Sequence, residues 1–167
     1  VSGPVALEPP MFVKTVTVES AQEMYEAVMA EADDADIIIK SAAVADYAPA
    51  EVSQEKIKKA EGDAVIPLVR TKDILAALGE KKREDQFICG FAMETEHLLE
   101  NAKAKREKKK VDMIVANSIR QSGAGFGGDT NVATLITGEG MRPLPLMSKE
   151  ALAMEILDEA ARGLHLR

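Results

Sequence analysis

Two groups of lysines are the residues of this sequence best suited to bind a polyanion. Lys56 opens a run with Lys58 and Lys59, and lysines on a loop could close over a phosphorylated ligand and shield it from water. Lys105 and Lys109 are spaced i, i+4, so on a helix both would project from one face and could bind one triphosphate. Both groups could instead be solvated charge runs. The second group belongs to a basic cluster that stands out in a chain of net charge −7: Lys103, Lys105, Arg106, Lys108, Lys109 and Lys110.

A loop of small residues at 41–47 is a further candidate. Ala42 and Ala43 would let a flat or charged ligand approach the backbone, and Asp46 could accept a hydrogen bond from a ribose hydroxyl or bind a metal ion. A lone Asp more often serves as a turn or cap carboxylate. Phe91 also has two interpretations, which are packing in the core and stacking on a base.

Several common nucleotide and metal motifs are missing from the sequence. Neither G-x-G-x-x-G nor the P-loop pattern occurs, and the glycines at 123–128 precede a predicted strand rather than a helix. Phosphate binding would therefore use lysine side chains. His97 and His165 have no metal-ligand spacing, and the single cysteine, Cys89, lies in an apolar stretch where we expect a buried side chain.

The composition argues against several classes of partner. The net charge of −7 disfavours a general nucleic-acid binder. The longest apolar runs, such as residues 37–39, are far shorter than the roughly 20 residues that a membrane span needs, so no membrane partner is expected. One cysteine cannot form an internal disulfide, which suits a reducing compartment and predicts a cytoplasmic protein.

Apolar, β-branched segments alternate with helical patterns along the chain. Strands are predicted at residues 12–18, 37–40, 64–69, 87–91, 113–116, 131–137 and 141–146. Helices are predicted at residues 20–32, 74–82, 95–110 and from 148 onward, capped by Ser20, Asp73, Thr95 and Ser148. The segment 41–62 has no clear period, and a loop of this length is usually functional or disordered.

This order of elements predicts an α/β fold in a single domain over residues 1–167. Strand–helix–strand units connect by right-handed crossovers, which gives a three-layer sandwich with a mostly parallel sheet between helices. The strand at 37–40 should be buried on both faces, and the last two strands should form an antiparallel edge hairpin. Ligands on such sheets bind beyond the carboxyl ends of the strands. That rule selects the loops at 41–47, at 91–95 and from Asn117 onward.

Seven stretches, in this order, resemble the phosphopantothenoylcysteine synthetase family, which in bacteria is usually the C-terminal part of a bifunctional coenzyme A biosynthesis protein. They are VSGPV at 1–5, AAVADY at 42–47, EKIKK at 55–59, KDIL at 72–75, GFAMET at 90–95, VAN at 115–117 and GFGGDTN at 125–131. The resemblance implies a Rossmann-like fold, a homodimer and a CTP-dependent ligase. 4′-Phosphopantothenate would attack CTP to give an acyl-cytidylate, and cysteine would then displace CMP to form the amide. Magnesium would support the first step, and no flavin is implied for this chain.

The resemblance also implies roles for individual residues. Asp46 corresponds to the loop Asp near the ribose and the metal, and Lys56 to a catalytic lysine that contacts the nucleotide and selects cytosine. Lys105 and Lys109 correspond to the phosphate-binding pair, and Phe91 to an aromatic residue beside the nucleotide. Further nucleotide contacts are implied for Ala42, Ala43, Lys72, Asp73 and Ile74.

Two features depart from the family pattern. Thr71 and Lys72 stand where the family often has Asn-Pro. The family's opening strand–loop–helix, whose I-S-N-x-S-S-G-type motif supplies an Asn for the acyl-cytidylate, has no counterpart ahead of Val1. We therefore expect a domain that lacks this segment, binds CTP and is weakly active or inactive by itself, with a mobile flap at about residues 58–64 and a fused decarboxylase domain in the full protein. The alternatives are a non-catalytic Rossmann-like nucleotide-binding module and a regulatory subunit whose basic helix meets an acidic partner.

Overall fold

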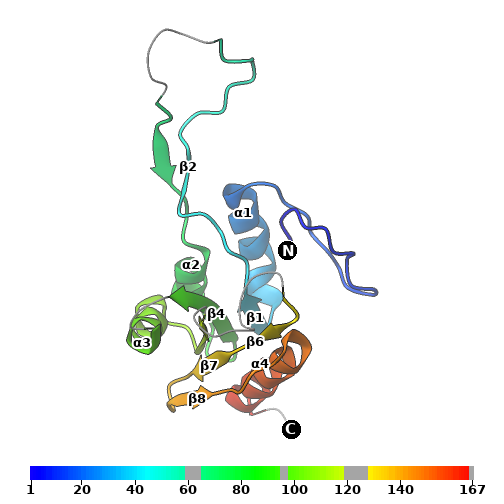
Figure 1. The fold of residues 1–167 in the computed structure, drawn as a ribbon, viewed down its shortest axis with the longest axis vertical. Helices are drawn as coiled ribbons and strands as arrows, with labels where there is room; N and C mark the ends of the chain where they lie inside the picture. The colour runs from blue at the N-terminus through cyan, green and yellow to red at the C-terminus, as the bar shows by residue number, and fades with distance from the viewer. Residues whose placement is uncertain (59–64, 95–97, 119–127, 166–167) are drawn as a thin grey trace. The chain divides into compact units, whose positions relative to one another are not determined.

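The computed structural model describes residues 1–58, 65–94, 98–118 and 128–165 (Figure 1). They form two compact units. The first contains Val1–Ala30 and Ala42–Ile74, and the second contains Glu31–Ser41 and Leu75–Arg167. Most of the implied flap, the predicted cap Thr95 and most of the glycine turn lie outside the described residues.

The second unit is built on a five-stranded mixed sheet in the order β1-β4-β5-β7-β8. The strands β1 (Ile37–Lys40), β4 (Phe87–Glu94) and β5 (Met113–Ser118) run parallel to one another. β7 (Ala133–Ile136) pairs antiparallel with β5 and forms a hairpin with β8 (Met141–Pro143) at the sheet edge. The predicted α/β fold with a parallel sheet and an antiparallel edge hairpin is confirmed.

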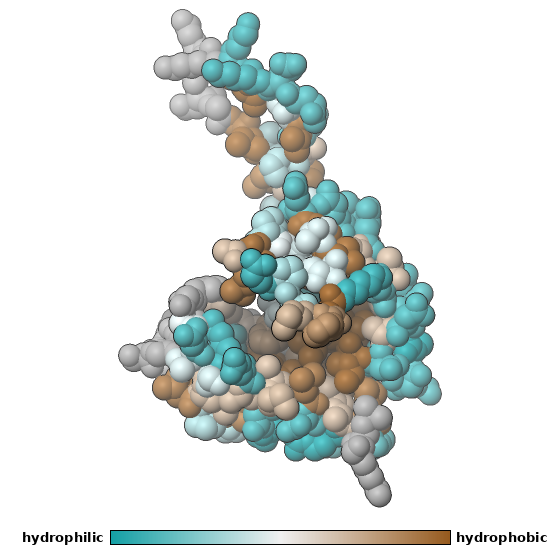
Figure 2. All heavy atoms as spheres, turned by 90° about the vertical axis from the view of Figure 1, so that its right-hand side faces the viewer, coloured by the Kyte–Doolittle hydropathy of each residue, from teal (hydrophilic) through white to brown (hydrophobic). Residues whose placement is uncertain are grey.

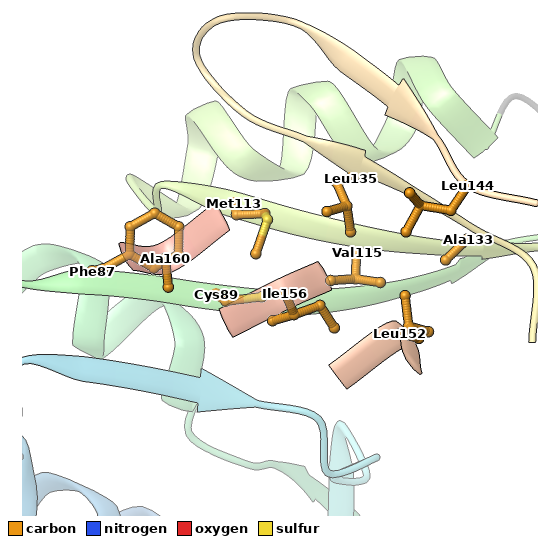
Figure 3. Packing of buried hydrophobic residues seen from close by; sticks show 10 residues of the cluster. All are labelled: Phe87, Cys89, Met113, Val115, Ala133, Leu135, Leu144, Leu152, Ile156 and Ala160. Carbon is orange, nitrogen blue, oxygen red and sulfur yellow. The ribbon is translucent and has the colours of Figure 1, made fainter. Parts of the chain in front are cut away.

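One face of this sheet packs against α4 (Lys149–Gly163). Figure 3 shows alternate residues of the strands pointing toward this helix. The helix contributes Leu152, Ile156 and Ala160, which are spaced one turn apart as the sequence predicted. The sheet side of the cluster consists of Phe87, Cys89, Met113, Val115, Ala133, Leu135 and Leu144.

The opposite face of the sheet carries α2 (Ile74–Lys81) and α3 (Leu98–Lys109). Gly90 follows Cys89 along β4, so the two residues face opposite sides of the sheet. A Cβ on Gly90 would meet the side chains of Leu75 in α2 and Ile114 in β5. α3 contacts β4 and β5, and Figures 1 and 3 show it on the side away from α4. The second unit is therefore the predicted helix–sheet–helix sandwich.

Both serine caps that the sequence predicted and that lie in described residues are formed. Ser148 Oγ accepts a hydrogen bond from Ala151 N at 3.1 Å and starts α4. In the first unit, Glu23 N donates to Ser20 Oγ at 3.2 Å while Glu23 Oε2 accepts from Ser20 N at 3.3 Å, so the capping box starts α1 (Ala21–Glu31). Hydrogen bonds from the backbone N–H groups of Glu19 and Ser20 lower the pKa of Glu23. A short 3₁₀ turn at Ala32–Asp34 follows α1.

The remaining strands are short pairs. In the first unit β2 (Tyr47–Pro49) and β3 (Leu68–Arg70) form an antiparallel two-stranded ribbon. In the second unit β6 (Thr130–Asn131) pairs with β9 (Met147–Ser148). The strand predicted at 64–69 begins only at Leu68, and residues 65–67 form no strand.

Two predictions about strands were wrong. Residues 12–18 form no strand in the described chain, but only a single parallel bridge between Ser2 and Thr17. β-branched residues favour an extended chain, yet a strand needs a neighbour to hydrogen-bond with along its length. β1 is not buried on both faces, because Ile39 is 38% exposed and β4 is its only strand partner among the described residues.

The close approach of α2 to the end of α3 requires a glycine. Gly79 lies inside α2, where glycine ordinarily lowers helix stability by about 1 kcal/mol relative to alanine. A Cβ at this position would lie 1.8 Å from the carbonyl oxygen of Lys109, the last residue of α3. The absence of a side chain at Gly79 therefore allows α2 to pack closely against the end of α3, the helix that carries Lys105 and Lys109.

We predict that Gly79→Ala destabilises the protein by about 1–3 kcal/mol, because overpacking against a backbone carbonyl outweighs the gain in helix propensity. The free energy of unfolding in urea measures this effect. Gly128→Ala is the matched control, since a Cβ there would meet nothing within 4 Å. Equal or greater stability of Gly79→Ala would show that α2 and α3 are not in this contact.

Candidate functional site

The basic helix α3 places one lysine on the carboxyl-terminal half of a central strand. Lys105 Nζ donates a hydrogen bond of 3.0 Å to the backbone oxygen of Phe91 in β4. The strand predicted to end at Phe91 continues to Glu94, because residues 91–94 pair with β5, so Phe91 lies inside β4 rather than at its end. Lys105 is half-buried, so its aliphatic stem is held along the protein surface. Folds with parallel sheets bind their ligands beyond the carboxyl ends of the strands, the side toward which Lys105 lies.

Burial separates two sides of α3. Lys105, Arg106 and Lys109 are half-buried, whereas Lys103, Lys108 and Lys110 are exposed. Lys105 and Lys109 are therefore the lysines of the inward side, and their role as a phosphate-binding pair stays a prediction. The last turn of α3 also carries Arg106, Lys108 and Lys109, and cations there stabilise a helix by opposing the negative end of its dipole. Part of the basic cluster thus has a structural role.

The side chain and the backbone of Phe91 make different contacts. Its side chain is partly buried and packs against the hydrophobic core cluster on the α4 face of the sheet. Its backbone oxygen is the acceptor for Lys105. Core packing is therefore what the side chain does in this structure, and contact with a nucleotide stays a prediction.

Asn117 ends the neighbouring strand in register with Met93 of β4. Its side-chain Oδ1 is buried and has no hydrogen-bond partner. Buried polar atoms are almost always paired, and no donor for this oxygen lies among the described residues. The carboxyl-terminal halves of β4 and β5 thus carry an ammonium donor and an amide acceptor.

In the first unit, the loop that carries Asp46 is tied to the segment after β3. Thr71 N donates to the backbone oxygen of Asp46 at 3.0 Å, and Thr71 Oγ1 donates to the backbone oxygen of Ala45 at 2.6 Å. Ala42, Ala43 and Asp46 are exposed. The structure therefore brings Asp46 beside the stretch that begins with Lys72. One nucleotide could contact both only if they lie close together.

Lys72 is held by an aromatic ring of α1. Its Nζ lies 4.6 Å from the ring centroid of Tyr25, within the range of a cation–π interaction. Asp73 is exposed and precedes α2, while Ile74 is 2% exposed. A ligand contact by Ile74 would therefore use its backbone rather than its side chain.

Lys56 is exposed on the segment between β2 and β3. Lys58 is exposed as well, and Lys59 lies outside the described residues. No hydrogen bond or ion pair joins Lys56 to Asp46 or Lys72 in the described structure, so the catalytic role of Lys56 stays a prediction.

Asp46 suits magnesium that arrives with a nucleotide better than a site made by protein alone. Within the described ranges no group of three or more His, Cys, Asp or Glu residues is placed to hold a metal ion. Magnesium in nucleotide sites is usually bound by one or two carboxylates together with phosphates and water. A single exposed carboxylate fits that chemistry, and Asp46 as a magnesium ligand stays a prediction.

Cys89 is excluded as a nucleophile. It is fully buried in β4, as the sequence predicted, and burial, helped by the negative charge of Asp112, raises its pKa to about 12. Asp112 itself joins three elements, because Oδ2 accepts from Ile88 N at 2.8 Å and Oδ1 pairs with Lys82. These contacts of Asp112 lie at the amino ends of the strands, whereas Lys105 lies toward the carboxyl ends.

Sequence reasoning did not find the contacts that bring Thr71, Tyr25 and Asn117 into these sites. Thr71 and Tyr25 contact residues far away in the sequence, so no local pattern could have singled them out. Asn117 was selected only as the start of a loop, and its unpaired buried oxygen needed the packed sheet to be recognised. In the part of the chain that is described, no helix is both long and apolar enough to cross a membrane.

Comparison with known proteins agrees with the resemblance found in the sequence. The model of the DNA/pantothenate metabolism flavoprotein C-terminal domain matches residues 1–164. The Coenzyme A biosynthesis bifunctional protein CoaBC of Bacillus subtilis (strain 168) is 47% identical over 163 residues, which cover 96% of this chain and 40% of that protein. The CoaBC of Vibrio vulnificus (strain YJ016) is 45% identical over 161 residues, with 95% and 40% covered.

A solved structure extends this agreement to the fold. The crystal structure of the C-terminal domain of a CoaBC protein has a TM-score of 0.79 and 44% identity, and the match covers 98% of this chain and 74% of that one. The chain spans about 40% of the length of the curated relatives it matches. By sequence over almost its whole length, and by fold, this chain belongs to the family of the DNA/pantothenate metabolism flavoprotein C-terminal domain.

Proposed function

We propose that this chain is the nucleotide-binding part of a ligase that joins 4′-phosphopantothenate to cysteine at the expense of CTP. The observation that carries the proposal is the half-buried pair Lys105 and Lys109, with Lys105 Nζ on the backbone of Phe91 in the carboxyl-terminal half of β4. Family membership supports the same reaction, because the relatives are coenzyme A biosynthesis proteins. A lysine pair is the kind of phosphate ligand expected in a chain without a glycine-rich phosphate loop.

The proposed chemistry has two steps. The carboxylate of 4′-phosphopantothenate attacks the α-phosphate of CTP, which forms an acyl-cytidylate and releases pyrophosphate. The amine of cysteine then attacks the acyl carbon, forms the amide and releases CMP. Lys105 and Lys109 would neutralise the phosphate charge of CTP together with magnesium near Asp46, and Lys56 would contact the nucleotide.

We expect magnesium–CTP to stabilise the chain more than ATP or NAD does. A ligand that binds only the folded state stabilises it by about 2.7 kcal/mol at 100 times its dissociation constant, which raises the melting temperature. Thermal denaturation with each nucleotide, with and without magnesium, measures the shift. Stabilisation by NAD without any by CTP would instead favour a non-catalytic dinucleotide-binding module.

The inward lysines of α3 should matter for CTP and the outward ones should not. We predict that Lys105→Met with Lys109→Met weakens CTP binding at least about tenfold, because charge-assisted hydrogen bonds are lost while the apolar stems remain. Lys103→Met with Lys108→Met removes the same charge from the exposed side of the helix and is the matched control. Calorimetric titration gives both affinities. Equal losses of CTP affinity in the two variants would show that the basic cluster acts only by general electrostatic attraction.

The ribbon of the first unit supports a homodimer. Six large apolar side chains on or beside it are at least half exposed: Val52, Ile57, Val65, Ile66, Leu68 and Val69. Figure 2 shows hydrophobic surface among the hydrophilic atoms of this ribbon. Each of its two strands has one strand partner among the described residues, so their outer edges could pair with a second copy. We infer that the ribbon is the dimer contact.

Sedimentation measures this inference directly. Wild-type protein should sediment as a dimer, and Val69→Lys should shift it toward the monomer, because the substitution puts a charge in the proposed contact. Leu157→Lys, on the exposed side of α4, is the control and should remain a dimer. A wild-type monomer at all concentrations would contradict the proposal.

The remaining proposals concern the whole protein. We propose a cytoplasmic enzyme in which this part is fused to a decarboxylase, as the word "bifunctional" in the names of its relatives suggests. The weak or absent turnover expected of this chain by itself also stays a prediction. Amide formation from 4′-phosphopantothenate, CTP and cysteine, with and without an added Asn-bearing N-terminal segment, measures it.

A further inference from the structure

We propose that Thr71 is a positioning residue, which fixes the loop of Asp46 and thereby sets how tightly the chain binds magnesium–CTP. The inference rests on the proposed function, because it takes Asp46 as a ligand of the nucleotide or its metal. It concerns residues of the first unit only. Thr71 stands where the family often has Asn.

Two hydrogen bonds from Thr71 hold the loop of Asp46 next to the end of the β2–β3 ribbon. Tyr47 and Arg70 are the pair at the end of the ribbon, and Arg70 also lies over the ring of Tyr47 at 5.6 Å. One residue further on, Thr71 N donates to the oxygen of Asp46 at 3.0 Å, which continues the antiparallel pattern. The Thr71 hydroxyl then donates to the oxygen of Ala45 at 2.6 Å. The backbone of Thr71 thus holds Asp46, and its side chain holds Ala45, the next residue along the loop.

These two bonds act on the residues whose backbone angles aim the Asp46 carboxylate. Residues 41–45 belong to no helix or strand, and Ala45 and Asp46 are exposed, so packing does not fix them. Each hydrogen bond removes rotational freedom that ligand binding would otherwise have to remove. Since a single neutral hydrogen bond contributes little to folding, the effect should appear in ligand affinity rather than in the fold.

Thr71 can act as a clamp because it is itself held on both sides. β3 precedes it, and Lys72 follows it with its ammonium 4.6 Å from the centre of the Tyr25 ring in α1. The capping box of Ser20 and Glu23 fixes the start of that helix. The loop of Asp46 is therefore tied through Thr71 to two regular elements of the same unit.

The test compares two substitutions at one position. Thr71→Val keeps the shape and removes the hydroxyl, and we expect the dissociation constant for magnesium–CTP to rise about three- to tenfold. Thr71→Ser keeps the hydroxyl and should restore affinity to near the wild-type value. Thr15→Val is the matched control, because the Thr15 hydroxyl also meets a backbone oxygen, that of Val13, but only within its own loop. If Thr71→Val does not fold, Thr71→Ala takes its place.

A double-mutant cycle separates positioning from a general structural role. In an Asp46→Ala background, which removes the carboxylate that Thr71 is proposed to position, Thr71→Val should cause no further loss of affinity. Equal losses in both backgrounds would overturn the inference, and so would an unchanged affinity of Thr71→Val when the wild-type chain binds CTP. A wild-type chain that does not bind magnesium–CTP would overturn the proposed function, and this inference with it.

Discussion

The burial of β4 and β5 on both faces is the constraint on which the rest of the second unit depends. Ile88, Cys89, Met113, Ile114 and Val115 have no exposed surface. Because neighbouring residues of a strand point to opposite faces, helices must cover both sides of this pair. The register that joins Cys89 to Met113 then decides where each strand ends, and so where Phe91 and Asn117 lie.

The polar groups of the sheet are divided between its two ends. At the amino ends, Asp112 holds Ile88 and Lys82, and Gln86 Nε2 donates to the oxygens of Ala32 and Ala35 at 2.7 Å each. These contacts satisfy groups that would be costly to bury alone. Toward the carboxyl ends, Asn117 Oδ1 has no hydrogen-bond partner among the described residues, and Lys105 Nζ donates to a backbone oxygen. The stabilising polar contacts thus gather at the amino ends, and the groups proposed to bind a ligand lie toward the other ends.

The packing of α3 against the core positions the lysines that are proposed to bind phosphate. The helix buries Ala102 and meets α2 where Gly79 has no side chain, which turns Lys105 and Lys109 inward. In the first unit, a different device does the equivalent work, since hydrogen bonds from Thr71 rather than buried side chains hold the loop of Asp46. The lysines of the second unit are therefore positioned by close packing, and the Asp46 loop of the first unit by a few polar contacts.

Local patterns in the sequence determined the helices, most of the sheet and the candidate lysine pair. Ser20 with Glu23, Ser148, the one-turn spacing of Leu152 and Ile156, and the i, i+4 spacing of Lys105 and Lys109 all act over a few residues. The predicted strand at 12–18 failed because a strand depends on a neighbour that its own residues do not specify.

Only the tertiary structure decided which side chains meet. Thr71 is 26 residues from Ala45, and Lys105 is 14 residues from Phe91, so no sequence spacing encodes these contacts. The same holds for Lys72 on Tyr25 and for the unpaired oxygen of Asn117. The sequence by itself determined the types of residue at the candidate site and the elements that carry them. Folding decided their partners, because partners are set by the packing of segments that are distant along the chain.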